Sequence, residues 1–226
     1  MEENLLKAEF KSIKTVLDEF DFPNLYTIDS SSMRKWVKMA LCNMDGASVA
    51  SDNDDTILCY ENSIIRVSYG ATKLVLMNEY SNWVFKIPFK NRKINYCQIE
   101  AEIYEDARRE NLDKFFAPCY FLENFDDVKI YVMQRAVTSY DKLYSDLFER
   151  LSNEGRTEEE ASDIIEEAED CAEFVNWLFP YYSEEPEEFD RFIEFLESAN
   201  INDLHSGNIG YINGEIVLID YSGYRG

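Results

Sequence analysis

Histidine is almost absent from this sequence, which contains only His205, and its five cysteines include no Cys-x-x-Cys pair. A single histidine excludes a histidine-rich metal site, and a Ser-His-Asp hydrolase would have to use His205. The odd number and the spacing of the cysteines favour a reduced, cytoplasmic chain. Because the sequence also lacks a signal peptide and any apolar run near 18 residues, we expect a soluble protein without a membrane partner.

Basic residues are scarce as well, with 22 lysines and arginines against 45 aspartates and glutamates and a formal charge of −23. Direct nucleic-acid binding needs clustered basic side chains, so this balance argues against a nucleic-acid partner. It does not argue against a nucleotide, because a bound Mg²⁺ supplies positive charge locally. The acidity also suits a protein that imitates nucleic acid, one that docks on a basic partner, or one that is simply kept soluble.

The C-terminal segment carries most of the chemical information. Asp203 and Asn208 lie in one polar loop, and the apolar strand that follows ends on Asp220. Between them, Asn213-Gly214 predicts the turn of a β-hairpin. Three oxygen-bearing side chains in this pattern can serve a metal-bound phosphate, since Mg²⁺ takes a few protein oxygens and completes its shell with water and phosphate. The alternative is an ordinary hairpin with polar turn residues.

This segment resembles the catalytic loop and metal-binding segment of the protein-kinase-like superfamily. Asp-Leu-His-Ser-Gly-Asn runs from Asp203 to Asn208, and Leu-Ile-Asp ends at Asp220, a form closest to the aminoglycoside, choline and atypical-kinase branches. The resemblance implies that Asp203 is the catalytic base and that Asn208 and Asp220 bind Mg²⁺. His205 would be a loop-structuring side chain. Tyr221-Ser222 replaces the Phe-Gly that follows the metal-binding aspartate in the family.

A second constellation lies upstream. Lys86 interrupts the strand-like apolar run 81–89, and Glu100 follows fourteen residues later, at the start of a helical pattern. A lysine in a buried strand is costly unless it is paired, and kinase-like folds pair a strand lysine with a helix glutamate so that the lysine can hold phosphates. Glu100 fits this role better than Glu102, because the family's glutamate is followed four residues on by a bulky residue, here Tyr104. The alternative is a surface lysine on an edge strand beside an ordinary acidic helix.

The expected phosphate-covering loop is depleted. Kinase-like enzymes usually place a Gly-rich loop over the phosphates, and its counterpart here, residues 64–76, contains one glycine where the family fingerprint has three. Gly70 permits a turn, and Ser68 or Thr72 could donate to a phosphate.

A hinge is predicted further along. The segments 117–122 and 128–133 read as two strands around an acidic turn,. By the resemblance, the hinge between two lobes would follow, and backbone groups at Gln134 and Ala136 would hydrogen-bond adenine.

Together these segments predict an α+β protein with a protein-kinase-like two-lobe fold. The chain divides into a helical extension at 1–56 with a loop at 48–55, a small antiparallel-sheet lobe at 57–136 with one helix at about 96–109, and a reduced, mostly helical lobe at 137–226 with the catalytic-loop hairpin,.

Local signals place helix ends in these regions. The extension opens with apolar residues at helical intervals, and it either packs on the small lobe or binds a partner. In the helical lobe, Asn153–Gly155 predicts a helix end, Thr157 with Glu160 predicts a helix start, and Pro180 ends the helix that follows,.

Two functions remain open from the sequence. The first is an ATP- and Mg²⁺-dependent phosphotransferase acting on a protein Ser/Thr or a small-molecule hydroxyl, with Lys86, oriented by Glu100, on the phosphates. The second is a catalytically weak kinase-like binding or inhibitor protein that acts through an acidic surface on a basic host partner. The depleted loop favours the second, as does the end of the chain six residues beyond Asp220, where we expect no peptide-substrate platform. Compact chains of this kind resemble proteins of phages and mobile elements.

Overall fold

The computed structural model of this chain describes residues 6, 9–11, 13, 14, 17, 39, 42, 46–52, 55–60, 63–69, 72–89, 93–125, 128–168, 173–183 and 185–223. The chain forms two compact units. Unit 1 consists of residues 1–101 and 119–135, and unit 2 consists of residues 102–118 and 136–226. These bounds differ from the predicted division, in which residues 102–118 belong to the small lobe and residues 1–56 form a separate extension.

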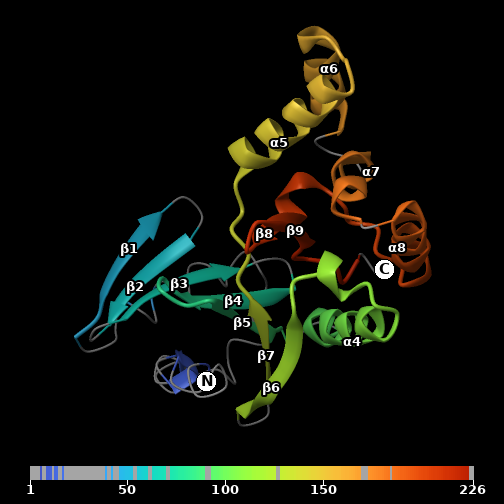
Figure 1. The fold of residues 1–226 in the computed structure, drawn as a ribbon. Coiled ribbons are helices and arrows are strands. Elements are labelled where there is room, and N and C mark those ends of the chain that lie inside the picture. The colour runs from blue at the N-terminus through green and yellow to red at the C-terminus, as the bar shows by residue number, and fades with distance from the viewer. Residues whose placement is uncertain are drawn as a thin grey trace. The chain divides into compact units, whose positions relative to one another are not determined.

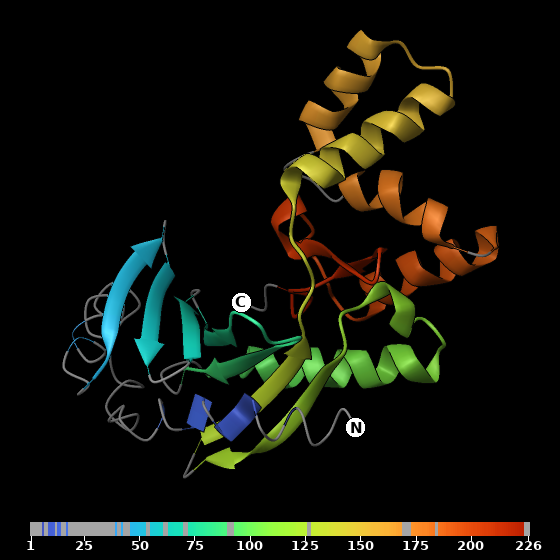
Figure 2. The same ribbon diagram turned by 60° about the vertical axis from the view of Figure 1, so that its left-hand side comes forward.

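Unit 1 contains one antiparallel sheet of seven strands in the order β1-β2-β3-β4-β5-β7-β6, so β5 and β7 are interior strands (Figures 1 and 2). The strands are β1 Ser48–Asp52, β2 Asp55–Tyr60, β3 Ser63–Tyr69, β4 Lys73–Asn78, β5 Trp83–Pro88, β6 Cys119–Phe125 and β7 Val128–Gln134. With the helices described below, this sheet confirms the α+β class. The prediction of a loop at residues 48–55 is wrong, because β1 occupies most of this range and pairs with β2.

The two faces of this sheet differ in character. Successive side chains of a strand point to opposite faces, and one face carries the apolar core, including Leu74, Leu76 and Phe85. Phe10, Ile13 and Leu17 of the N-terminal segment pack on this face, where the rings of Phe10 and Phe85 stack with centroids 5.4 Å apart. This finding agrees with the expectation that the segment packs on the small lobe. The residues that alternate with the core, among them Lys86, lie on the opposite face.

Helix α4, Tyr96–Arg109, has the bounds predicted from the sequence. It begins where the Asn95 side chain accepts a hydrogen bond from the backbone N–H of Gln98 at 3.0 Å, which satisfies one of the unpaired donors of the first turn,. Arg108 and Arg109 lie in its last turn, where positive charge favours the helix dipole,. Glu100 therefore lies in the second turn of a helix with a capped N-terminus.

Unit 2 is mostly helical and ends in a two-stranded hairpin. Its elements are η1 Asp113–Phe115, α5 Tyr140–Asn153, α6 Glu158–Ala168, α7 Glu173–Leu178, η2 Phe179–Tyr182, α8 Pro186–Ser198, η3 Ser206–Asn208, β8 Ile209–Ile212 and β9 Glu215–Leu218. The predicted end of α5 at Asn153 is confirmed. So is the helix start at Thr157, where the backbone N–H of Thr157 donates to the Glu160 carboxylate at 2.9 Å and the N–H of Glu160 donates to the Thr157 hydroxyl at 3.2 Å,.

Aromatic side chains fill the core of unit 2. The rings of Phe179 and Phe192 stack with centroids 5.3 Å apart, and Phe116 meets Tyr221 edge to face at 5.0 Å,. Tyr221 is fully buried, and its hydroxyl donates to the carbonyl of Ala117 at 2.7 Å. The N–H of Ala117 in turn donates to the carbonyl of Leu218 at 2.8 Å. These bonds hold the chain on both sides of Asp220.

Candidate functional site

Lys86 and Glu100 form a buried ion pair in unit 1. The ammonium of Lys86 donates to Oε2 of Glu100 at 2.9 Å, and the two side chains are 6% and 0% exposed. β5 lies between β4 and β7, so Lys86 is on an interior strand. The pairing expected from the resemblance is present, and the alternative of a surface lysine on an edge strand is wrong.

A second lysine, which was not predicted from the sequence, shares the same carboxylate. Lys73, the first residue of β4, donates to Oε1 of Glu100 at 2.6 Å, and its side chain is only 7% exposed. Val75 stands directly opposite Lys86 in the β4–β5 ladder, and Lys73 lies two residues before Val75, on the same face,. Each oxygen of Glu100 therefore holds one ammonium, and we call this group the Lys73–Glu100–Lys86 triad. The one available signal was a lysine at the start of an apolar strand.

The triad has neutral thiols beside it. Burial is the main cause that raises the pKa of Cys97 well above its ordinary value, and the negative charge of Glu100 adds to the effect,. Burial likewise raises the pKa of Cys119 to about 12, again with help from Glu100. Both thiols stay protonated near neutral pH and are unsuited to act as nucleophiles. Charge at this place is carried by the two lysines and the glutamate.

Ser68 lies on the same face of the sheet as the triad. It pairs with Val75 across β3 and β4, and Val75 pairs with Lys86, so the three side chains form one cross-strand row,. Thr72 immediately precedes β4, and its carbonyl accepts a hydrogen bond from Phe89 N–H at 3.0 Å. Gly70, the remaining residue predicted for the phosphate loop, lies outside the described residues.

In unit 2 the hairpin brings Asn208 and Asp220 to the same end. Ile209 pairs with Leu218, so the residues just outside the ladder face each other, and the N–H of Ile219 donates to the Asn208 carbonyl at 2.9 Å. The hairpin turn has the Asn-Gly geometry predicted for it, with φ of 53° at Asn213 and 92° at Gly214,. Asn208 thus stands opposite Ile219, the residue that precedes Asp220 in the chain.

Asp203 is joined to this pair through the backbone. The Asn208 side chain donates from Nδ2 to the backbone carbonyl of Asp203 at 2.8 Å, while the Asp203 carboxylate is 47% exposed. This bond uses the donor end of the Asn208 amide, so Oδ1 is the end with which Asn208 could bind a cation. The Asp203 carboxylate, which takes no part in that bond, has the exposure that an incoming hydroxyl requires.

His205 shapes the loop between Asp203 and Asn208, as the resemblance implied. Its Nδ1 accepts from the N–H of Gly207 at 3.1 Å, and its Nε2 lies 3.8 Å from an Asp203 carboxylate oxygen. A Cβ added at Gly207 would come within 2.9 Å of the imidazole ring, so a larger residue at this position would push the His205 side chain aside.

The segment after Asp220 packs against the loop that leads to Asp203. Gly223 has φ of +67°, in the left-handed region that glycine tolerates best, and an added Cβ would lie 2.3 Å from the carbonyl oxygen of Asn200. The Ser222 hydroxyl donates to Oδ1 of Asp220 at 3.3 Å. Close backbone packing therefore brings the Asp203 loop and the Asp220 segment together within unit 2.

The predicted hinge residues fall in different units. Gln134 is the last residue of β7 and pairs with Trp83, and unit 1 ends at the next residue. Ala136 begins the second stretch of unit 2, where a Cβ added at Gly210 would lie 2.7 Å from its methyl group. The following residue, Val137, exchanges two backbone hydrogen bonds with Tyr211, at 2.9 and 3.0 Å. The hairpin thus anchors the start of this stretch.

Unit 2 contains two side chains with oxygen atoms of the kind that Mg²⁺ binds, Asn208 and Asp220. Among the described residues no group of three or more His, Cys, Asp or Glu side chains could hold a metal ion. Asn208 Oδ1 and the Asp220 carboxylate would supply two ligands, which is a suitable number for Mg²⁺ because this cation keeps several waters and binds substrate phosphates. The lysines of the triad are the kind of side chain that binds phosphate oxygens as point charges.

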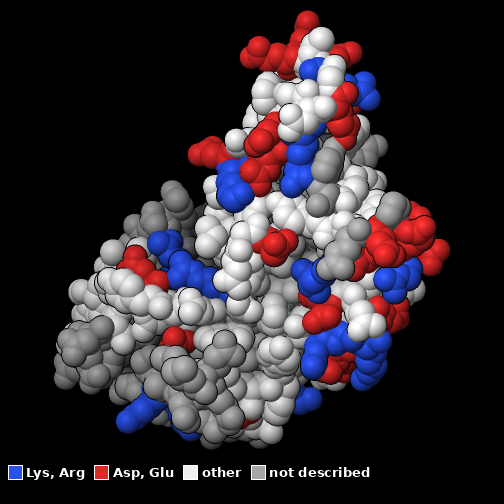
Figure 3. Space-filling model, in the orientation of Figure 1, with Lys and Arg blue, Asp and Glu red and all other residues white. Residues whose placement is uncertain are grey.

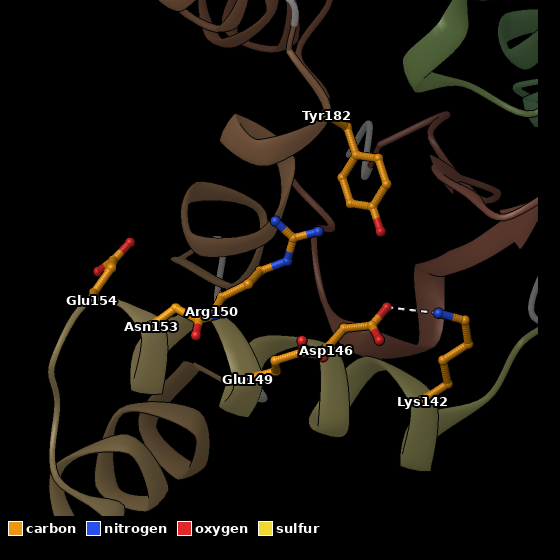
Figure 4. Close-up of a pocket in the computed structure, with 7 residues that line it drawn as sticks. All are labelled: Lys142, Asp146, Glu149, Arg150, Asn153, Glu154 and Tyr182. Atoms are coloured by element: carbon orange, nitrogen blue, oxygen red, sulfur yellow. Dashed lines mark hydrogen bonds and ion pairs between the residues drawn. The ribbon is translucent and has the colours of Figure 1, made fainter.

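Unit 2 also contains a pocket of about 600 Å³ beside α5 (Figure 4). Its wall includes acids and bases together with one aromatic ring: Lys142, Asp146, Glu149, Arg150, Glu154 and Tyr182. Arg150 extends toward Tyr182, with its guanidinium 5.0 Å from the centre of the ring.

Asp146 is the best-connected acid of this pocket. It accepts from the Lys142 ammonium and from the Tyr211 hydroxyl, each at 2.7 Å. Burial by itself would raise the pKa of Asp146, but the two hydrogen bonds outweigh burial and hold the pKa below its ordinary value,. Burial and the hydrogen bond to Asp146 raise the pKa of Tyr211, so its hydroxyl remains a donor. The contact therefore links α5 to the hairpin that carries Asn208.

We expect Tyr211→Phe to destabilise the chain by about 1 kcal/mol at neutral pH, the net value of one hydrogen bond, or somewhat more because the acceptor is charged. A lowered folded-state pKa stabilises the protein above the unfolded pKa, and this stabilisation is lost as the pH falls through the folded value. The stability difference between wild type and variant should therefore shrink below about pH 4. Urea unfolding at several pH values measures it, with Tyr80→Phe, at an 80% exposed residue, as control. A stability difference between wild type and Tyr211→Phe that does not change with pH would contradict a lowered pKa of Asp146 caused by the Tyr211 hydrogen bond.

Comparisons with known proteins do not place the chain in a family: no protein-family model matches it, and neither the curated proteins nor the solved structures gave a match. None of the described helices is long and apolar enough to cross a membrane.

Proposed function

We propose that this chain is a Mg²⁺- and ATP-dependent phosphotransferase with a protein-kinase-like two-lobe fold, acting in the cytoplasm on a hydroxyl of a protein Ser/Thr or a small molecule. The observation that carries the proposal is the buried pairing of Lys86 with Glu100, at 2.9 Å, in a chain that also holds Asn208 and Asp220 at one end of a hairpin. Burying a lysine and a glutamate is costly, and replacing such pairs by apolar residues is often neutral or stabilising. A role in binding a ligand therefore explains the buried Lys86–Glu100 pair better than a contribution to stability does.

Each side chain has a distinct role in this proposal. Lys86 holds phosphate oxygens, and Glu100 fixes the position of its ammonium. Asn208 and Asp220 bind Mg²⁺, which when present neutralises charge on the phosphates. Asp203 accepts the proton of the attacking hydroxyl as a general base, a role for which its exposed carboxylate is suited,.

The remaining predicted contacts are secondary in this proposal. Ser68 lies in the cross-strand row of Lys86, so its hydroxyl is the polar group of β3 best suited to donate to a phosphate. Thr72 and Gly70 would belong to the turn over the phosphates, and backbone groups at Gln134 and Ala136 would bind adenine.

Mg·ATP binding tests this function. We expect wild type to bind Mg·ATP in calorimetric titrations, and Lys86→Met to weaken binding about tenfold or more, since hydrogen bonds to charged groups are worth about 1.5–3 kcal/mol. Lys129→Met is the matched control, because Lys129 is an exposed lysine of β7, the strand next to β5. Absence of binding by wild type at millimolar Mg·ATP would remove the proposal.

The second candidate is a catalytically weak kinase-like protein that binds or inhibits a basic partner. The observation that favours it is the acidic first turn of α6, with Glu158, Glu159 and Glu160 all exposed, in a chain of formal charge −23. In Figure 3, however, bases are interspersed with the acids around α5 and α6 on the visible face. A Lys86→Ala, Asp220→Ala double variant separates the two functions, because only the partner-binding function should survive it.

A further inference from the structure

We propose that Lys73 is a second phosphate-binding residue. Two lysines on adjacent strands, both paired with Glu100, then bind the polyphosphate of the nucleotide. This inference rests on the proposed function and extends it to a residue that the kinase resemblance does not assign.

The first support is the position of Lys73 in the chain. It is the first residue of β4. By the kinase resemblance, residues 64–76 correspond to the phosphate-covering loop, and they contain a single glycine. Glycines in such loops let backbone N–H groups approach phosphate closely. The ammonium of Lys73 would supply by charge part of what those backbone groups supply in a Gly-rich loop.

The second support is the shared carboxylate. Lys73 binds Oε1 of Glu100 at 2.6 Å and Lys86 binds Oε2 at 2.9 Å, so both ammonium groups are held at one place on one face of the sheet. The two cations also repel each other, and an anion bound by both would relieve that repulsion.

The third support is the cost of burial. A single lysine is enough to neutralise the charge of Glu100, and Lys86 already does so. Lys73 is the first residue of its strand and has a long, flexible side chain that could reach water, yet this side chain is only 7% exposed. Desolvating a second ammonium costs free energy that a purely structural pair would not need to spend. Binding of a polyanion is a reason to retain it.

Binding of inorganic tripolyphosphate tests Lys73 directly, since this probe has the phosphates but neither base nor sugar. In calorimetric titrations of the full chain we expect Lys73→Met to weaken tripolyphosphate about tenfold and to make binding less sensitive to NaCl. Lys73→Arg, which keeps the charge, should retain most of the affinity, and Lys129→Met should match wild type. If Lys73→Met binds tripolyphosphate as wild type does while Lys86→Met does not, the inference is overturned and the proposed function stands.

A measurement on wild type guards against a variant that fails to fold. Amine-reactive labelling followed by mass spectrometry should show Lys73 and Lys86 protected by tripolyphosphate, with Lys129 labelled equally with and without it. Unchanged labelling of Lys73 at a tripolyphosphate concentration that protects Lys86 would overturn the inference. Protection of Lys73 in a protein that shows no ATP turnover would support the inference and count against the phosphotransferase.

Discussion

Asp203→Asn is expected to lower Mg²⁺-dependent phosphotransfer by about 10²–10⁴-fold, the range that a positioned general base contributes. The amide cannot accept the proton of the attacking hydroxyl, so the chemical step should be slowed while nucleotide affinity stays nearly unchanged. Steady-state ATP turnover and calorimetric binding of Mg·ATP, measured on the same preparation, separate these two effects.

The structure explains why this substitution should spare the fold. Asn208 binds the backbone carbonyl of Asp203 rather than its carboxylate, and the carboxylate is 47% exposed. Asp163→Asn is the matched control, because Asp163 is an exposed acid on α6 in the same unit. Equal turnover by Asp203→Asn and Asp163→Asn would mean that Asp203 is not the base, even if Mg·ATP binds.

Local signals in the sequence predicted much of the fold because they act over few residues. The bounds of α4, the capping box at Thr157 and the Asn213-Gly214 turn all follow from residue types at fixed spacing,. Strand β1 was missed because Ser48–Asp52 is polar and lacks the apolar alternation of a half-buried strand,. Its formation is better explained by pairing with β2 than by its own composition.

In the candidate site, too, features set by nearby residues could be predicted and features set by packing between distant segments could not. The Lys86–Glu100 pair was predicted from the kinase resemblance, because a lysine inside an apolar strand indicates only that some partner is needed. Lys73 could not be predicted, because its place beside Glu100 depends on the register between β4 and β5, which residue spacing does not reveal,. The approach of Gly223 to Asn200 depends in the same way on packing between segments distant in sequence.

Glu100→Ala is expected to cause a large loss of folding stability. The substitution leaves the two buried ammonium groups of the triad without their shared carboxylate. Removing one partner of a buried ion pair costs about 3–5 kcal/mol, and in a chain of this size each kcal/mol lowers Tm by about 2–4 °C. Urea and thermal unfolding measure the loss. Glu105→Ala is the matched control on the same helix: its carboxylate binds Arg108 at 3.0 Å but is 46% exposed, and an exposed pair contributes about 0–1 kcal/mol. Equal stability of the two variants would mean that the triad is not a buried ionic cluster.

A triple variant then separates stability from function. Lys73→Met, Glu100→Leu and Lys86→Met together replace the charges by apolar side chains of similar length, a change that is often neutral or stabilising by about 1–4 kcal/mol. We therefore expect the triple variant to regain the stability lost in Glu100→Ala but not to bind Mg·ATP or tripolyphosphate. Recovery of the fold without recovery of binding would mean that the three charges are retained for a ligand. A triple variant that still binds Mg·ATP like wild type would instead show that neither lysine holds phosphate, and the case for a phosphotransferase would lose its central residues.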